Sequence, residues 1–105
     1  MLKIITANTN GIRSAVQKGF QSWLSAQDAD IVCIQELKSQ DHEVPEELTL
    51  GPSSFRYFHC AEKKGYSGCA VLTKKEPDEV IIGFGSEEFD REGRYVEVRF
   101  KNLIV

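Results

Sequence analysis

A run of apolar residues that ends in a carboxylate, Ile31-Val32-Cys33-Ile34-Gln35-Glu36, constrains the fold of this chain more than any other stretch. A continuous apolar run of this length is typical of a β-strand covered on both faces, as in an α/β sheet. Ligands of such sheets bind beyond the carboxyl ends of the strands, where Glu36 stands. Glu36 either faces solvent, as most strand-end carboxylates do, or holds a divalent metal ion; we take the metal as the hypothesis.

The composition fits one small soluble domain. The chain has 105 residues, of which 41% are hydrophobic and 28% are charged. No stretch is apolar enough to span a bilayer or to act as a signal peptide, so we expect no membrane partner and a cytoplasmic protein. Three cysteines at spacings that match no zinc pattern favour a reducing compartment. The net charge of −3 argues against a basic nucleic-acid-binding domain but leaves room for a locally basic groove.

The start of the chain predicts a strand–helix–strand unit. Residues 2–7 read as a strand, and turn-forming residues follow it. We expect one helix that is capped by Ser14 and runs to residue 27, although Gly19 weakens it. The apolar stripe of this helix consists of Val16, Phe20, Trp23 and Leu24. The Ile31 run is the second strand, and two strands joined in this way lie parallel.

Parallel strands end at the same edge of a sheet, so Asn8, Asn10 and Glu36 should gather on one rim. The two asparagines alone are explained by an Asx turn that closes the first strand. Their other interpretation is that an amide oxygen assists a metal ion while an amide N–H holds a phosphate oxygen. Magnesium prefers oxygen ligands and is often held by one or two carboxylates together with substrate phosphates.

The remainder of the chain predicts further short strands. We expect a short helix over residues 44–48 and an acidic loop over residues 86–93. The expected strands are residues 55–60, 69–73, 80–82, 94–100 and 103–105, of which the first two form an antiparallel hairpin. The last segment, residues 103–105, begins an apolar strand, and no cap or partner strand follows it. We therefore expect the sequence to be the front part of a longer protein.

Three polar segments are compatible either with an ordinary surface or with contacts to a nucleic-acid backbone. Arg13 and Lys18 flank the start of the predicted helix, and phosphate contacts of this kind position a substrate without reading its sequence. Lys63, Lys64 and Tyr66 form a second basic and aromatic loop. Residues 90–94 are either a turn with a weak surface ion pair or a loop that orients an arginine toward a phosphate.

Four blocks of the sequence together resemble the exodeoxyribonuclease III family of apurinic/apyrimidinic endonucleases, within the endonuclease/exonuclease/phosphatase superfamily. The blocks are Asn8-Thr9-Asn10-Gly11-Ile12-Arg13, Asp30-Ile31-Val32-Cys33-Ile34-Gln35-Glu36-Leu37-Lys38, Gly65-Tyr66-Ser67-Gly68 and Asp90-Arg91-Glu92-Gly93-Arg94. They come in the order that the family has. The resemblance implies an α/β, DNase I-like fold, in which this chain forms half of a four-layer α/β sandwich with a mixed sheet and flanking helices.

The resemblance also implies site residues and a cofactor. Glu36 matches the metal-binding glutamate and Asn8 the asparagine beside the metal, with Mg²⁺ as the ion and Mn²⁺ as an alternative. The positions implied to contact substrate are Asn10, Arg13, Tyr66 and Arg94. No catalytic base or catalytic tyrosine is expected in residues 1–105, which would be the N-terminal portion of a single domain whose C-terminal half is absent.

The implied function is Mg²⁺-dependent phosphodiester hydrolysis in double-stranded DNA, at abasic sites and 3′ ends, by the full-length protein. We expect the 105-residue fragment to be inactive, because it offers a metal ligand and no general base. Two alternatives stay open at this point. One is a superfamily phosphatase that acts on a small or lipid phosphate. The other is a non-catalytic module that binds DNA weakly or self-associates through unpaired strand edges.

Overall fold

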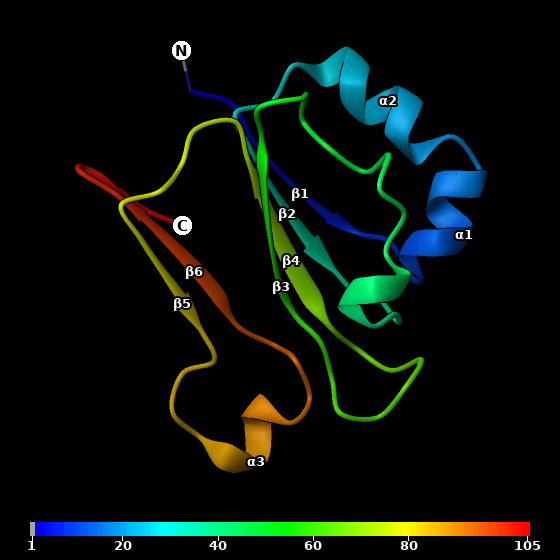
Figure 1. Cartoon of the computed structure of the whole chain (residues 1–105), viewed down its shortest axis with the longest axis vertical. Helices are drawn as coiled ribbons and strands as arrows, with labels where there is room; N and C mark the ends of the chain where they lie inside the picture. Colours follow the sequence, from blue (N-terminus) through cyan, green and yellow to red (C-terminus); the bar gives the residue numbers. More distant parts are fainter. Residues whose placement is uncertain (1) are drawn as a thin grey trace.

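The computed structural model describes residues 2–105 and shows two β-sheets packed face to face (Figure 1). Sheet A has the strand order β1-β2-β4-β3 and sheet B the order β5-β6-β7. The strands of sheet A are β1 (Ile4–Asn8), β2 (Ile31–Gln35), β3 (Phe55–His59) and β4 (Cys69–Thr73). Those of sheet B are β5 (Glu79–Ile82), β6 (Val96–Phe100) and β7 (Leu103–Ile104). The expected mixed α/β architecture is confirmed.

Strand β2 lies inside sheet A and is covered on both faces. It pairs parallel with β1 and antiparallel with β4. Val32 and Ile34 belong to the apolar core under the helices, whereas Ile31 and Cys33 pack toward sheet B. This alternation explains why the first four residues of β2 are all apolar instead of every second one. The predicted parallel pair and the predicted β3–β4 hairpin are both confirmed.

Two helices, α1 (Ile12–Gln17) and α2 (Phe20–Gln27), pack on the outer face of sheet A through Ile12 and Leu24 (Figure 1). The prediction of one helix is wrong, because Gly19 adopts a left-handed conformation with φ 100° and separates the two. Ser14 is not a cap; it lies inside α1, and Gly11 precedes the first turn. Trp23 was expected in the buried stripe but is 49% exposed.

Other predicted boundaries also need correction. Residues 44–48 do not form a helix; a 3₁₀ turn, η1 (Asp41–Glu43), precedes them. The carboxylate of Glu43 accepts the backbone N–H of Gln40 at 2.9 Å, which starts η1 earlier than the proline suggested. The loop over residues 86–93 contains a short helix, α3 (Glu87–Asp90). The predicted strands are present, with ends displaced by one or two residues.

Sheet B packs against sheet A through a second apolar core around Val98, Ile31 and Val71. Ile104 faces away from this core and is 62% exposed, and Ile82, at the end of β5, is 52% exposed. No helix within residues 2–105 has the length and apolar character that a membrane crossing requires.

Candidate nuclease site

The loops that follow β1 and β2 are joined by backbone hydrogen bonds. Asn8 pairs with Gln35 at the end of the parallel ladder. Beyond it, the N–H of Thr9 donates to the Gln35 carbonyl at 3.0 Å, and the N–H of Gly11 donates to the Glu36 carbonyl at 2.8 Å. The structure therefore brings the predicted residues Asn8, Asn10 and Glu36 to one rim. Their roles as ligands stay predictions.

Left-handed backbone conformations are concentrated at this rim. Asn10, Glu36, Lys38 and Ser67 have φ between 46° and 53°, and they are four of the five non-glycine residues with positive φ within residues 2–105. Each such residue costs about 1 kcal/mol relative to the right-handed form. Backbone strain of this kind persists where the surrounding structure enforces it and is often found at functional sites.

The two asparagines are held by different partners. The side-chain oxygen of Asn8 accepts the backbone N–H of Asn10 at 3.1 Å, which confirms the Asx turn. Asn10 in turn accepts a hydrogen bond from the Lys38 ammonium, 2.5 Å away. Sequence reasoning assigned no role to Lys38, although it lies only two residues beyond Glu36. Its contact with Asn10 adds a positive charge to the rim.

The donor atoms at the rim fit a hard divalent cation. The Glu36 side chain is half-buried, and its carboxylate has no hydrogen bond or ion pair with any side chain in residues 2–105. No group of three or more His, Cys, Asp or Glu side chains suited to a metal occurs in that part of the chain. One carboxylate with a neighbouring amide oxygen is the sparse ligand set that Mg²⁺ uses when substrate phosphates and water complete its shell.

The loop between β3 and β4 is fixed to the same rim. The N–H of Leu37 donates to the Gly68 carbonyl at 3.0 Å, and the N–H of Lys38 donates to the Ser67 carbonyl at 2.7 Å. These bonds place Tyr66, one residue earlier, beside the residues that follow β2. The rim therefore unites three loops that are distant in sequence.

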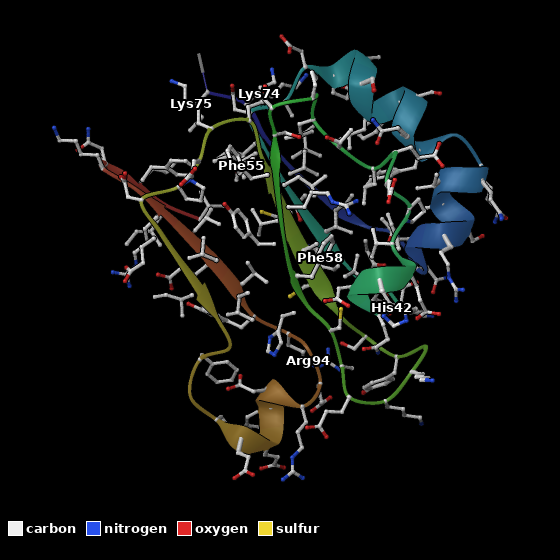
Figure 2. The ribbon with its side chains drawn as sticks, in the orientation of Figure 1. His42, Phe55, Phe58, Lys74, Lys75 and Arg94 are labelled. Atoms are coloured by element: carbon white, nitrogen blue, oxygen red, sulfur yellow. The ribbon has the colours of Figure 1, made fainter. Side chains whose placement is uncertain are left out.

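Tyr66 belongs to a charged cluster with Glu92 and Arg94. The Tyr66 hydroxyl donates to Oε1 of Glu92 at 3.1 Å and accepts from Nη2 of Arg94 at 3.1 Å. Nε and Nη2 of Arg94 also donate to the same Glu92 oxygen, at 3.1 and 3.0 Å. The bond to Glu92, and then the bond to Tyr66, raise the pKa of Arg94. Figure 2 shows Arg94 beside the loop that joins β3 to β4.

A glycine fixes the loop that carries Glu92 and Arg94. Gly93 has φ 65°, and a Cβ atom built on it would lie 2.5 Å from backbone atoms of His59, Cys60 and Ala61. No side chain fits this position. The loop is therefore pressed directly against the backbone at the end of β3, which keeps Arg94 close to Tyr66.

Arg13 lies on the other side of the rim. It forms an ion pair with Glu43 at 3.5 Å, and its side chain is 57% exposed. A hollow beside α1 is lined by Arg13, Lys38 and Gly65, among others. The structure thus places Arg13 near the Lys38 side of the rim and does not bring it into contact with Tyr66 or Arg94. Contact of Arg13 with DNA stays a prediction.

Comparison with known proteins decides the family. The profile of the Endonuclease/Exonuclease/phosphatase family matches residues 5–105. The chain belongs to this family. Within the family it is 46% identical over 106 aligned positions to an exodeoxyribonuclease of Bacillus subtilis, with 99% of this chain and 40% of that protein covered. It is 38% identical to the DNA repair nuclease APEX1 of Danio rerio, with 99% of this chain and 34% of that protein covered.

A solved structure of the same fold comes from Archaeoglobus fulgidus and is described as an AP endonuclease. It superposes with a TM-score of 0.80 at 30% identity, over 99% of this chain and 39% of that one. The chain therefore spans between about one third and two fifths of the length of these family members. The DNase I-like fold expected from the sequence is confirmed.

Proposed function

We propose that the protein containing this chain is a Mg²⁺-dependent DNA-repair nuclease of the exodeoxyribonuclease III type. Its substrates would be double-stranded DNA with abasic sites or 3′ ends. The observation that carries the proposal is that Glu36, whose carboxylate is unpaired within residues 2–105, lies on one rim with Lys38 and is linked through the Tyr66 loop to Arg94. In this proposal residues 1–105 form the N-terminal portion of one longer endonuclease/exonuclease/phosphatase domain.

The metal would be held by Glu36 and Asn8, with Mn²⁺ as an alternative to Mg²⁺. When bound, such an ion polarises a phosphate and stabilises the leaving oxygen. The protein's own groups would orient the substrate around it. The Lys38 ammonium positions Asn10. The exposed guanidinium group of Arg94 lies beside Tyr66 and suits a phosphate oxygen. Arg13 would contact the DNA backbone farther along the rim.

We expect no general base for attack by water within residues 2–105. The ring nitrogen Nδ1 of His42 lies 3.6 Å from Asp41 on the exposed η1 turn. Nδ1 of His59 is within hydrogen-bond distance of the backbone of Tyr95. Because neither histidine is hydrogen-bonded to Asn8, Asn10 or Glu36, activation of water would depend on groups in the rest of the domain.

We expect the complete protein to cleave an abasic duplex in the presence of Mg²⁺ and the isolated 105-residue chain to give no turnover. The measurement is gel analysis of a labelled duplex that carries one synthetic abasic site. The matched control is the same duplex without that site. The proposal would be contradicted if the isolated chain cleaved the abasic duplex, if this activity co-purified with the chain, and if a Glu36→Gln variant lacked it.

A phosphatase acting on a small or lipid phosphate is the second candidate, since the family includes phosphatases by name. The spread of Arg13, Lys38, Lys63 and Arg94 over the rim favours an extended polyanion, because one small phosphate needs fewer cations. Assays of the complete protein on the abasic duplex and on inositol phosphates distinguish the two. Release of inorganic phosphate without DNA cleavage would support the phosphatase.

We also propose a cytoplasmic location. The three cysteines are free thiols, which suits a reducing compartment. Burial raises the pKa of the Cys69 thiol to about 11, so this side chain stays protonated at neutral pH. Fractionation of the native host cell tests the location.

The isolated chain should self-associate through its strand edges. β1 lies at the edge of sheet A, and its Ile4 side chain is 44% exposed. An apolar edge strand without a partner is a template for pairing with a second chain. Sedimentation velocity should show a sedimentation coefficient that rises with concentration. Ile4→Lys should suppress this rise, whereas Gln17→Lys, at an exposed position of α1, should not. A monomer at every concentration would refute self-association.

A further inference from the structure

We infer that Glu92 is a positioning residue that holds Tyr66 and Arg94 in one arrangement for a DNA phosphate. This inference rests on the proposed function. Glu92 itself would not touch the reacting atoms. Its carboxylate would instead fix which hydrogen-bond donors of the cluster face the substrate.

The donor count supports this role. Arg94 carries five N–H donors. One on Nε and one on Nη2 point to Glu92, and the second on Nη2 points to the Tyr66 hydroxyl. Nη1 has no hydrogen-bond partner within residues 2–105, so its two donors are available to a phosphate. The Tyr66 hydroxyl directs its own hydrogen to Glu92.

The surroundings limit the freedom of the cluster. The Lys63 ammonium lies 5.6 Å from the centroid of the Tyr66 ring, and the Arg94 guanidinium lies 5.8 Å from it. Two cations therefore share one aromatic ring, and one of them, Arg94, also binds the Glu92 carboxylate. Gly93 fixes the backbone between Glu92 and Arg94 against the end of β3. A guanidinium held in this way loses less conformational entropy on binding than a free one.

Charge and positioning make opposite predictions for the loss of Glu92. A carboxylate beside the DNA backbone repels it, so removing the charge alone should strengthen binding. Loss of positioning should weaken binding, because Arg94 and Tyr66 would have to be ordered by the substrate. The sign of the change therefore distinguishes a positioning carboxylate from one that only competes with DNA for Arg94.

The experiment measures equilibrium binding of the complete protein to an abasic duplex in EDTA, in wild-type and Arg94→Ala backgrounds. Glu92→Ala should weaken binding about tenfold in the wild-type background. It should leave binding unchanged or stronger in the Arg94→Ala background, where no guanidinium remains to position. Glu92→Gln, which keeps an oxygen acceptor, should recover most of the loss. Glu62→Ala removes a nearby exposed carboxylate as the control and should weaken binding in neither background.

Stronger binding by Glu92→Ala in both backgrounds would overturn the inference. A second readout needs no DNA and so separates this inference from the proposed function. In protein with ¹⁵N-labelled arginine, the Arg94 Nε–H signal should be resolved in the wild type and lost by exchange in Glu92→Ala. A signal that is unchanged in Glu92→Ala would overturn the inference, whereas absence of abasic-duplex binding by the wild type would refute the proposed function.

Discussion

Glu36→Gln in the complete protein should lower cleavage of an abasic duplex by about a hundredfold to a thousandfold, because a bound divalent ion contributes several kcal/mol to such a reaction. The amide keeps the size of the side chain and removes the charge that would hold the ion. The measurement is the cleavage rate as a function of Mg²⁺ concentration. Raising Mg²⁺ should recover only part of the lost rate.

The matched control for this prediction is Glu76→Gln. Glu76 follows Lys75, which lies at the opposite end of the molecule from Arg94 in Figure 2. This variant should keep wild-type activity. Mg²⁺ should raise the unfolding temperature of the wild type and of Glu76→Gln but not that of Glu36→Gln, because only a ligand of the native state stabilises it. If Glu36→Gln kept the wild-type cleavage rate and the wild-type response to Mg²⁺, Glu36 would not be a metal ligand.

Gly93→Ala should lower the free energy of unfolding by about 3 kcal/mol or more, through overpacking together with a left-handed backbone. The new Cβ would lie 2.5 Å from three backbone atoms at the end of β3, and backbone cannot rotate away as a side chain can. The measurement is urea unfolding of the complete protein followed by circular dichroism. Because the shift moves the loop that carries Arg94, binding of an abasic duplex should weaken as well.

Gly65→Ala provides the control for the steric part of this effect. Gly65 has φ 72°, close to that of Gly93, but no atom lies within 4 Å of a Cβ placed there. Gly65→Ala should lower the free energy of unfolding only by the backbone strain, about 1 kcal/mol. Equal losses of stability in the two variants would show that contact with β3 contributes nothing at Gly93.

The half of the site built on parallel strands could be predicted from the sequence. The apolar run of β2 indicated a strand covered on both faces, and the preceding strand and helix indicated a parallel partner. Together these two local patterns place Asn8 and Glu36 at one edge. The left-handed backbone of Glu36 has no local signal, because non-glycine residues adopt it only where tertiary contacts impose it.

The rest of the site depends on contacts that no local pattern encodes. The hydrogen bond from Tyr66 to Glu92 joins residues 26 positions apart, and that from Lys38 to Asn10 joins residues 28 apart. The break between α1 and α2 was missed for a different reason. Apolar residues keep helical spacing across Gly19, so the periodicity continues through a point where the backbone does not.

The contacts that join the loops of the rim to one another are long in sequence, and this has a consequence for folding. Thr9 bonds to Gln35 across 26 residues, and Arg94 bonds to Tyr66 across 28. Contacts of such separation form late, after the entropy of closing large loops has been lost. A partly folded chain could retain α2 or the β3–β4 hairpin and still have no rim. The assembled rim is therefore a property of the cooperatively folded state alone, and its appearance during refolding would mark the last step.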